Sequence, residues 1–240
     1  MDRKLARQLG LAVAVLALAG HVRGALALEG YPESACREGL FGGPDAREPN
    51  LLLGRVVGKG TARLLSDMDG CPLHPARGKD CHNRRQIISP GILVAVLPSA
   101  MPGLTCVLDP GNPDLPTGWL PQVRVQMLPL DRTPPLAAWV GQWRESGDNT
   151  IVLTADRDGK LSVNGRAYWP GRGIPPEHTG EISGVAQPEG NRVTFGLDQD
   201  PPLCVAWLEL LGPDMLAVND TWQCGGANVT FGGVYTRARR

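Results

Sequence analysis

Hydrophobic and polar residues alternate in short runs along most of this 240-residue chain. The clearest runs cover residues 151–155 and 161–165, on either side of Asp158-Gly159. A two-residue period is typical of half-buried β-strands, and Asp-Gly between two such runs is a frequent hairpin turn. We therefore expect a β-hairpin over residues 150–165.

The same pattern of short apolar runs and turn residues predicts an all-β fold. The chain holds 31 glycines and 22 prolines, without a low-complexity tract or a collagen-like period. Because glycine and proline interrupt helices, a chain punctuated this often cannot hold many long ones. We expect five short strands over residues 51–130, including one with Val123, Val125 and Met127 on a single face, and seven or eight over residues 139–240.

These runs divide the chain into an irregular arm over residues 28–50, a small β domain over 51–130, a proline-containing linker over 131–138 and a second β domain over 139–240. The long early loops of the first domain suit a small barrel. In the second, strands follow one another at intervals of about 8 to 14 residues, each followed by a turn. That spacing predicts an antiparallel meander, either closed as a barrel or folded as a sandwich.

The first 27 residues have the pattern of a secretory signal peptide. Basic residues precede an uncharged apolar run over residues 9–20, and a small-x-small cleavage site ends at Ala27, with a competing site at Ala19. The apolar run is short for a membrane span, which needs about 20 residues. We therefore expect a periplasmic or secreted protein without stable membrane insertion after cleavage.

Charge excludes one class of partner. The leader holds four of the 24 Lys and Arg residues and one of the 24 Asp and Glu residues, so the mature chain carries 20 basic and 23 acidic residues. A slightly negative chain has no electrostatic reason to bind nucleic acid or anionic lipid.

Six cysteines in an exported chain predict disulfides, although six allow 15 pairings. Closeness in sequence favours one bond within the loop CPLHPARGKDCH and another between the apolar segments CVAWLELL and MLAVNDTWQC. The remaining two cysteines would then tie the arm to a strand. The expected pairs are Cys71–Cys81, Cys204–Cys224 and Cys36–Cys106.

The loop CPLHPARGKDCH also raises the question of a metal site, because it holds Cys71, His74, Cys81 and His82. Its spacing differs from the C-x2–4-C and H-x3–5-H pairs that structural zinc sites favour. An oxidising compartment also competes for the thiolates that zinc requires. We therefore expect a disulfide-stapled loop, and neither a metal nor a cofactor.

Residues that could support catalysis are few. The chain lacks G-x-S-x-G, H-E-x-x-H, S-x-x-K and a phosphate-binding glycine loop. His178 lies between Glu177 and Glu181 in sequence, but a solvated loop of mixed charge explains this trio better than an acid/base site. We expect no enzymatic activity.

Five of the six tryptophans lie in the second domain: Trp139, Trp143, Trp169, Trp207 and Trp222. Most should be core residues, because each buries a large area. One or two near an open end could line a binding surface. We expect Trp169, beside a loop that holds His178, to have this role, and include His178 in the same candidate site.

Residues 51–130 resemble the SH3-like domain of exported bacterial proteins, in which a hydrophobic strand after Pro-Gly precedes a Gly-Trp dipeptide that packs on the barrel. The matching residues are Gly70, Cys71, Cys81, Pro90, Gly91, Cys106, Gly118 and Trp119. The resemblance implies binding of peptides, often cell-wall peptides, rather than catalysis. Trp119 is the aromatic residue that this segment offers for such a site.

Residues 139–240 resemble a C-terminal domain of uncharacterised proteobacterial exported proteins, and more loosely a lipocalin-like barrel. The matching residues are Cys204, Leu208, Leu210, Leu211, Gly212, Leu216, Val218, Asp220, Cys224, Gly225, Gly226, Asn228, Val229, Phe231, Gly233, Val234, Tyr235 and Arg237. The resemblance carries no known chemistry. Relatives of this kind beside lysozyme-inhibitor-like modules imply an inhibitor role as one alternative.

Together these patterns predict a non-enzymatic binding protein of the bacterial cell envelope, with a cell-wall peptide or an envelope protein as partner. Two alternatives remain. An inhibitor of a lytic enzyme such as lysozyme would need a rigid exposed loop, for which the Cys71–Cys81 loop is the candidate. A carrier of a small apolar ligand would need a cavity where we expect packed tryptophans.

Overall fold

The structure is a computed structural model that describes residues 36, 49–67, 71–72, 80–98, 101–111, 117–145, 149–171, 177–198 and 200–238, without the side chains of 83–86. The predicted signal peptide, most of the predicted arm and the middle of the loop CPLHPARGKDCH, including His74, lie outside these residues. Among the described residues, no helix combines the length and the apolar character needed to cross a membrane.

The all-β prediction is confirmed, because the elements of the described residues are strands and two short 3-10 helices. The first group consists of β1 (Leu52–Val56), β2 (Ala62–Leu65), β3 (His82–Ile88), β4 (Leu93–Leu97), β5 (Leu104–Leu108), β6 (Thr117–Pro121), η1 (Gln122–Arg124) and β7 (Val125–Leu128). The second group consists of η2 (Leu136–Ala138), β8 (Gly141–Arg144), β9 (Thr150–Ala155), β10 (Leu161–Trp169), β11 (His178–Ala186), β12 (Arg192–Phe195), β13 (Ala206–Gly212), β14 (Met215–Asp220) and β15 (Gly233–Arg237).

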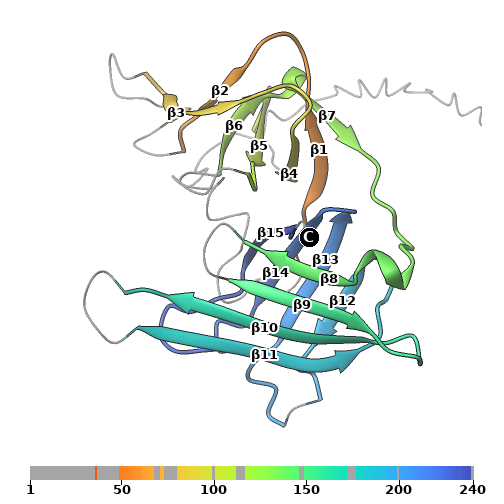
Figure 1. The fold of residues 1–240 in the computed structure, drawn as a ribbon. Coiled ribbons are helices and arrows are strands. Elements are labelled where there is room, and N and C mark those ends of the chain that lie inside the picture. The colour runs from red at the N-terminus through yellow and green to blue at the C-terminus, as the bar shows by residue number, and fades with distance from the viewer. Residues whose placement is uncertain are drawn as a thin grey trace, which may run out of the picture. The chain divides into compact units, whose positions relative to one another are not determined.

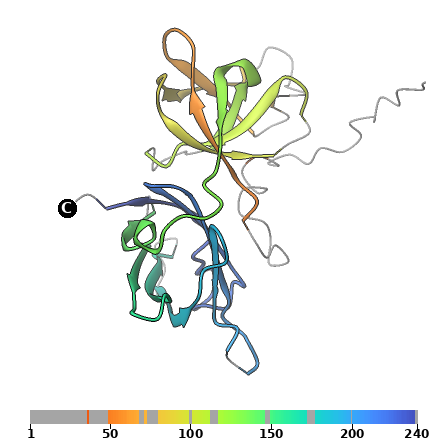
Figure 2. The same cartoon turned by 90° about the vertical axis from the view of Figure 1, so that its right-hand side faces the viewer.

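The first group forms a seven-stranded half-barrel sheet in the order β3-β2-β6-β5-β4-β1-β7 (Figure 2). This order is not that of the chain, so distant segments such as β1 and β7 become neighbours. The inner face is a small aliphatic cluster of Val56, Leu64, Ile88, Val94, Val96, Val107 and Leu120. Strands β3 and β7 are the two edges of the sheet.

Two details of the first sheet differ from expectation. The sheet has seven strands where five are expected, and Pro90-Gly91 is the turn between two of them, β3 and β4, with Gly91 at a φ of 94°. Val123 is not on a strand face; it lies in η1 and is 85 % exposed. The 3-10 turn displaces it because Pro121 ends the preceding strand; of the other residues of the predicted face, Val125 is half-buried and Met127 is exposed.

Two disulfides stabilise this sheet, and both have the predicted partners. Cys36 is bonded to Cys106 on β5, across 70 residues of sequence, and Cys71 to Cys81 across 10. The carboxylate of Asp67 accepts hydrogen bonds from the backbone N–H of Cys36 (2.7 Å) and from the indole of Trp119 (2.8 Å). A buried aspartate therefore connects a disulfide-bonded segment to a core tryptophan.

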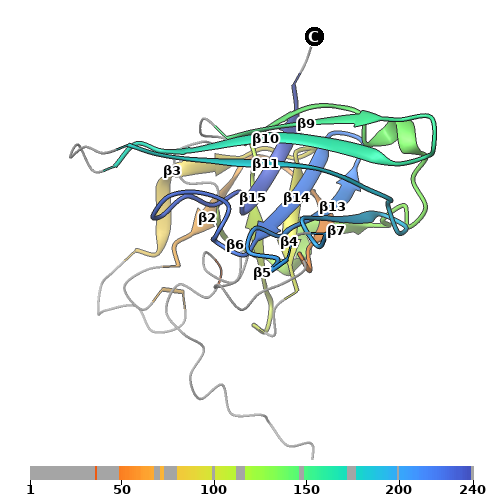
Figure 3. The same ribbon diagram turned by 90° about the horizontal axis from the view of Figure 1, so that it is seen from below.

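The second group forms a nearly closed barrel of eight antiparallel strands in the order β11-β10-β9-β8-β15-β14-β13-β12 (Figures 1 and 3). Its strands follow the order of the chain, as expected of a meander, and the last strand, β15, pairs with the first, β8. Neighbouring strands in this circle are joined by ladders except for β11 and β12. Between these two strands lies the seam of the barrel.

The hairpin predicted from alternation is β9 and β10, and it is confirmed. Ile151 and Leu153 are buried, and Asp158-Gly159 lies in the turn with Gly159 at a φ of 78°. The carboxylate of Asp156 accepts hydrogen bonds from two backbone N–H groups of the turn. This aspartate therefore stabilises the turn.

The interior of the barrel is packed with aromatic and aliphatic side chains. Trp139 and Trp143, together with Phe231 and Tyr235, have no exposed surface. Gly165 leaves room for Phe231, because a Cβ at this position would lie 3.0 Å from the ring and 2.6 Å from Ile182. The prediction of packed tryptophans in the second domain is confirmed for this pair.

Strand β11 begins earlier than expected. We predict His178 in a loop, but the strand starts at this residue, which pairs with Trp169 at the end of β10. The sequence does not reveal the start of this strand, because its exposed positions are polar and its first buried position is a glycine, Gly180. The longer hairpin brings the two candidate site residues of this domain together.

Candidate functional site

The seam of the barrel is closed at one end by residues 221–230, which we call the stapled loop. Gly225 forms a β-bridge with Gly180 on β11. The N–H of Glu181 donates to the carbonyl of Cys224 at 3.0 Å, and the N–H of Gly226 donates to the carbonyl of Thr179 at 3.1 Å. The stapled loop thus satisfies the free edge of β11 where β12 does not reach it.

Glycine is required at this contact because the two backbones approach closely. A Cβ on Gly180 would lie 2.6 Å from the carbonyl oxygen of Cys224, and one on Gly225 would lie 2.7 Å from the Cα of Gly180. Real Cβ atoms do not tolerate such distances. The Cys-Gly-Gly sequence of the stapled loop is therefore needed to seal the seam.

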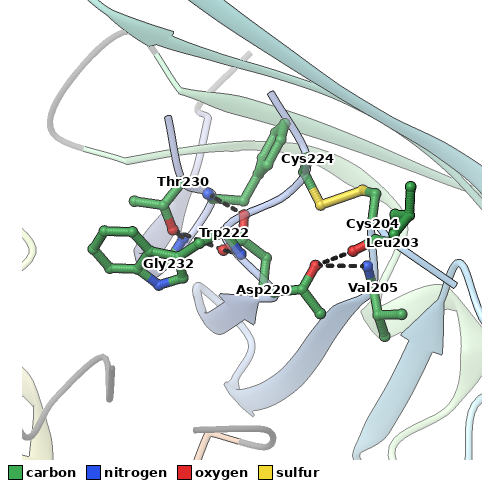
Figure 4. The surroundings of a disulfide bond; sticks show 10 residues. Leu203, Cys204, Val205, Asp220, Trp222, Cys224, Thr230 and Gly232 are labelled. Atoms are coloured by element: carbon green, nitrogen blue, oxygen red, sulfur yellow. Dashed lines mark hydrogen bonds between the residues drawn. A yellow bond between two sulfur atoms is a disulfide. The ribbon is translucent and has the colours of Figure 1, made fainter. Parts of the chain in front are cut away.

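The Cys204–Cys224 disulfide ties the stapled loop to the segment before β13 (Figure 4). This is the third predicted pair, so all three expected pairings are present. Thr221 reinforces the tie, since its N–H donates to the carbonyl of Val205 and its hydroxyl accepts from the N–H of Val205. The beginning of the loop is thus fixed to the barrel by covalent and hydrogen bonds.

Asp220 organises the stapled loop from the end of β14. Its carboxylate has no exposed surface and accepts three hydrogen bonds, from the N–H of Trp222 (3.0 Å), the hydroxyl of Thr230 (2.9 Å) and the N–H of Phe231 (2.8 Å) (Figure 4). Hydrogen bonds to a charged acceptor are stronger than those between neutral groups. Both ends of the loop are therefore held by one buried side chain.

Trp222 stands out in this loop. It adopts a φ of 60°, in the left-handed region that a bulky side chain rarely occupies, and its side chain is 43 % exposed. Such a conformation costs on the order of 1–3 kcal/mol and persists only where surrounding contacts impose it. Here the hydrogen bond to Asp220 and the disulfide at Cys224 impose it. In Figure 4 the indole points away from the disulfide, on the opposite side from Leu203.

The structure brings Trp169 and His178 together beside the stapled loop. Their ring centroids are 5.3 Å apart with an interplanar angle of 37°. The Nδ1 atom of His178 lies 2.5 Å from the carbonyl of Ala227 in the loop. Both candidate residues of the second domain therefore belong to one cluster, next to a loop that sequence alone does not connect with them.

The histidine cluster does not have the arrangement of an acid/base site. His178 is bonded to a backbone carbonyl, while Glu181 forms an exposed ion pair with Arg166 at 3.8 Å. Within the part of the chain that the structure describes, no group of three His, Cys, Asp or Glu side chains could hold a metal ion.

Trp119 lies in the half-barrel sheet, away from this cluster in the sequence and in the sheet topology. It has no exposed surface, and its indole N–H is bonded to Asp67. It packs in the core of the half-barrel sheet. A direct contact between Trp119 and a partner has no surface to support it.

Tyr235 and Glu145 contribute a buried polar group to the barrel core. The hydroxyl of Tyr235 donates to the carbonyl of Phe231 at 3.0 Å. Burial raises the pKa of Tyr235 well above its usual value, and the charges of Glu145 and Asp220 raise it further. Burial also raises the pKa of Glu145, against the effect of its hydrogen bond from Asn149. The phenol therefore stays neutral and serves as a hydrogen-bond donor behind the stapled loop.

The largest cavity among those described lies at the β8–β15 pairing, with a volume of about 860 Å³. Its central group is Arg237, whose guanidinium donates to the carbonyls of Pro213 (2.8 Å) and Ala138 (2.6 Å) and stacks on Trp143 at 4.1 Å. This cation is used to close the barrel. A second cavity, of about 80 Å³, lies at the seam between Ile182 and Phe195 and is too small for an organic ligand.

Sequence reasoning missed Trp222 as a site residue and included it among the tryptophans of the domain without a role. The one available signal is its place in the uncharged, glycine-rich stretch TWQCGGAN beside a cysteine. Its exposure depends on a backbone conformation that a two-residue period cannot reveal.

Searches against protein-family models, curated proteins and solved structures find no match to this chain. The protein is therefore characterised by its fold and its site alone. It is a disulfide-stabilised all-β protein with a half-barrel sheet, a nearly closed barrel and a braced, tryptophan-bearing loop on the barrel seam.

Proposed function

We propose that this chain is a non-enzymatic binding protein that acts at the bacterial cell envelope. The observation that carries this proposal is Trp222, a large exposed side chain held in a strained conformation by Asp220 and a disulfide. Tryptophan is enriched among the residues that dominate binding energies. A rigid loop loses little conformational entropy when it binds, which raises its affinity.

Three intramolecular disulfides fit a protein outside the cytoplasm. Together with the leader pattern over residues 1–27, they support a periplasmic or secreted location. The SH3-like resemblance of residues 51–130 and the C-terminal resemblance of residues 139–240 both support an envelope partner, either a cell-wall peptide or an envelope protein. The near balance of charges disfavours nucleic acid.

The stapled loop also favours a second candidate function, the inhibition of a lytic enzyme. Such an inhibitor needs an exposed loop that keeps its shape in a cleft. We expect this loop at Cys71–Cys81, whose middle lies outside the described residues, but residues 221–230 meet the same requirement. A titration of the purified protein against a lysozyme, with hydrolysis of cell walls as the readout, tests this candidate.

A carrier of small apolar ligands has less support. The place where such a ligand would lie is filled by Trp139, Trp143 and Phe231. Filling the interior of a small barrel with side chains leaves the outer surface and the loops for binding.

The main proposal is tested by sedimentation with fractionated envelopes. The chain from Leu28 onward, with its disulfides formed, is incubated separately with isolated cell walls and with envelope membranes, and the bound fraction is measured after centrifugation. We expect saturable binding to at least one fraction, lost on unfolding under reducing conditions. Recovery of the protein only in the supernatant of both fractions would contradict the proposal.

A further inference from the structure

Trp222 differs from the other barrel tryptophans in what its side chain does. Trp139 and Trp143 have no exposed surface, and Trp169 and Trp207 are half-buried. Trp222 leaves 43 % of its side chain in solvent at a position where its φ of 60° would suit glycine. Since glycine would relieve the strain, the indole has a role that the fold alone does not need.

The surroundings of Trp222 in the chain carry no charge. Residues 221–236 include no Asp, Glu, Lys or Arg. The exposed polar side chains of the stapled loop are Gln223 and Asn228, whose amides can each donate and accept hydrogen bonds. An aromatic face with neutral amides suits a neutral partner rich in hydroxyl and amide groups.

Sugar rings have this chemistry. One face of a pyranose presents C–H groups of slight positive polarity, which pack against the negative face of an aromatic ring. Its hydroxyl groups hydrogen-bond to amide side chains at the edge of the ring. A flat, exposed indole binds such a ring from one side, so a polymer can pass across it without entering a pocket. Trp222 lies outside the cavities described above, as this mode requires.

The stapled loop has little exposed apolar surface besides Trp222, too little for a protein partner. Stable protein interfaces bury about 800 Å² on each side around an apolar centre. The other exposed residues of the loop are small or polar, namely Gln223, Gly225, Gly226, Ala227 and Asn228. Leu203, which is 56 % exposed, lies on the other side of the disulfide (Figure 4). One indole and two amides match one or two sugar rings better.

We propose that the stapled loop binds an uncharged polysaccharide strand of the cell wall, with Trp222 stacked on a sugar ring and Gln223 and Asn228 bonded to its substituents. This inference rests on the proposed envelope-binding function and names its partner. The Asp220 hydrogen bonds and the Cys204–Cys224 disulfide keep the indole in place before the sugar arrives.

The test uses isothermal titration of the disulfide-bonded chain with two soluble probes, a neutral β-1,4-linked N-acetylglucosamine hexasaccharide and a synthetic cell-wall stem peptide. Sedimentation with intact cell walls is run in parallel. We expect binding to intact walls and to the hexasaccharide, and none to the peptide. Binding to walls and peptide without binding to the hexasaccharide would overturn the inference while the envelope-binding function stood. Binding to none of the probes, or only to membranes, would also overturn it.

Variants at residue 222 separate binding from folding. Trp222→Ala and Trp222→Gly should both weaken hexasaccharide binding by at least about tenfold, while Trp222→Phe, which keeps an aromatic face, stays within about threefold. The glycine variant should unfold at a temperature no lower than the alanine variant, because glycine accepts the positive φ. Leu203→Ala is the matched control, an exposed apolar residue beside the same disulfide, and should bind like the unaltered chain. Equal binding by the Trp222→Gly variant would overturn the inference.

Discussion

The two sheets of this protein reach stability by different routes. The half-barrel has a strand order that departs from the chain, two open edges and a small aliphatic core. The eight-stranded barrel joins neighbours in sequence, closes its last strand on its first and has a larger core with several aromatic side chains. Disulfides are distributed accordingly, with two in the open sheet and one at the seam of the barrel. Each disulfide holds at least one cysteine that lies outside the strands, such as Cys36, Cys71 and Cys204.

One arrangement of hydrogen bonds occurs in both sheets. In each, a buried aspartate accepts backbone hydrogen bonds from a segment that a disulfide also holds. Asp67 binds the N–H of Cys36, and Asp220 binds the N–H of Trp222, two residues before Cys224. An irregular segment has no ladder of its own, so its backbone donors need such an acceptor when buried. The difference is that the barrel presents its braced segment to solvent.

Among the changes that test this comparison, removal of the Cys36–Cys106 bond should cause the largest loss of stability. A disulfide that closes a loop of 70 residues should stabilise the fold by about 4 kcal/mol, against about 3 kcal/mol for the 20-residue loop of Cys204–Cys224. In a Cys36→Ala/Cys106→Ala variant, hydrogen exchange should accelerate in β4–β6 while β13 and β14 keep their protection. An equal acceleration in both sheets would show that they unfold as one unit.

The buried aspartates give the next effect. Asp220→Ala leaves three donors without their acceptor, and Asp67→Ala leaves two, so we expect losses of about 3 and about 2 kcal/mol in the free energy of unfolding. Urea titrations measure both. Asp156→Ala, at an exposed turn, is the control and should lose well under about 1 kcal/mol. Losses at Asp220 no larger than at Asp156 would contradict the bracing role.

The smallest effect concerns Glu209 on β13, a carboxylate with 1 % exposure in the barrel wall. Its Oε1 accepts from Asn191 at 3.2 Å and lies 3.4 Å from a guanidinium nitrogen of Arg132 and 3.5 Å from one of Arg192. Burial raises the pKa of Glu209 from its usual 4.5, although the two arginines and Asn191 act to lower it. The folded state therefore favours the protonated carboxyl.

Because the pKa is raised in the folded state, the stability that this group contributes is complete below pH 4.5 and is lost as the pH rises through the folded-state pKa. Glu209→Gln removes that loss. We expect the variant to be more stable than the unaltered chain at pH 7, by less than about 1 kcal/mol, and the gain to disappear at pH 4. Urea unfolding at both pH values provides the measurement. A variant that is less stable at pH 7 would show that the arginine contacts outweigh desolvation.

The sequence predicts the second sheet better than the first, for a physical reason. Alternation locates β9 and β10 because each strand pairs with its neighbour along the chain and one face of the hairpin is buried. In the first sheet the partner of a strand can lie far away, as β7 does from β1, so pattern alone gives fewer strands than the seven present. Val123 shows the limit, since a single 3-10 turn moves an apolar residue of regular spacing into solvent.

For the candidate site, the sequence predicts which residue types take part but not their backbone conformation. Trp169 and His178 are predicted from their position beside a loop, and cross-strand pairing places them in contact. Trp222 is not predicted, because its exposure follows from a backbone φ set by Asp220 and by the distant Cys204. The three disulfide pairs are predictable because two of them close short loops, which leaves a single choice for the third.

The pairing of β8 with β15 also has a consequence for the order in which the chain can fold. The contact of Thr236 with Arg144 spans 92 residues and closes the circle of strands. Hairpins such as β9–β10 can form as soon as they are synthesised, but the circle stays open until its final strand has left the ribosome. Synthesis from the N-terminus therefore leaves a partly assembled sheet with unpaired strand edges for a time. Such exposed edges are a target for chaperones.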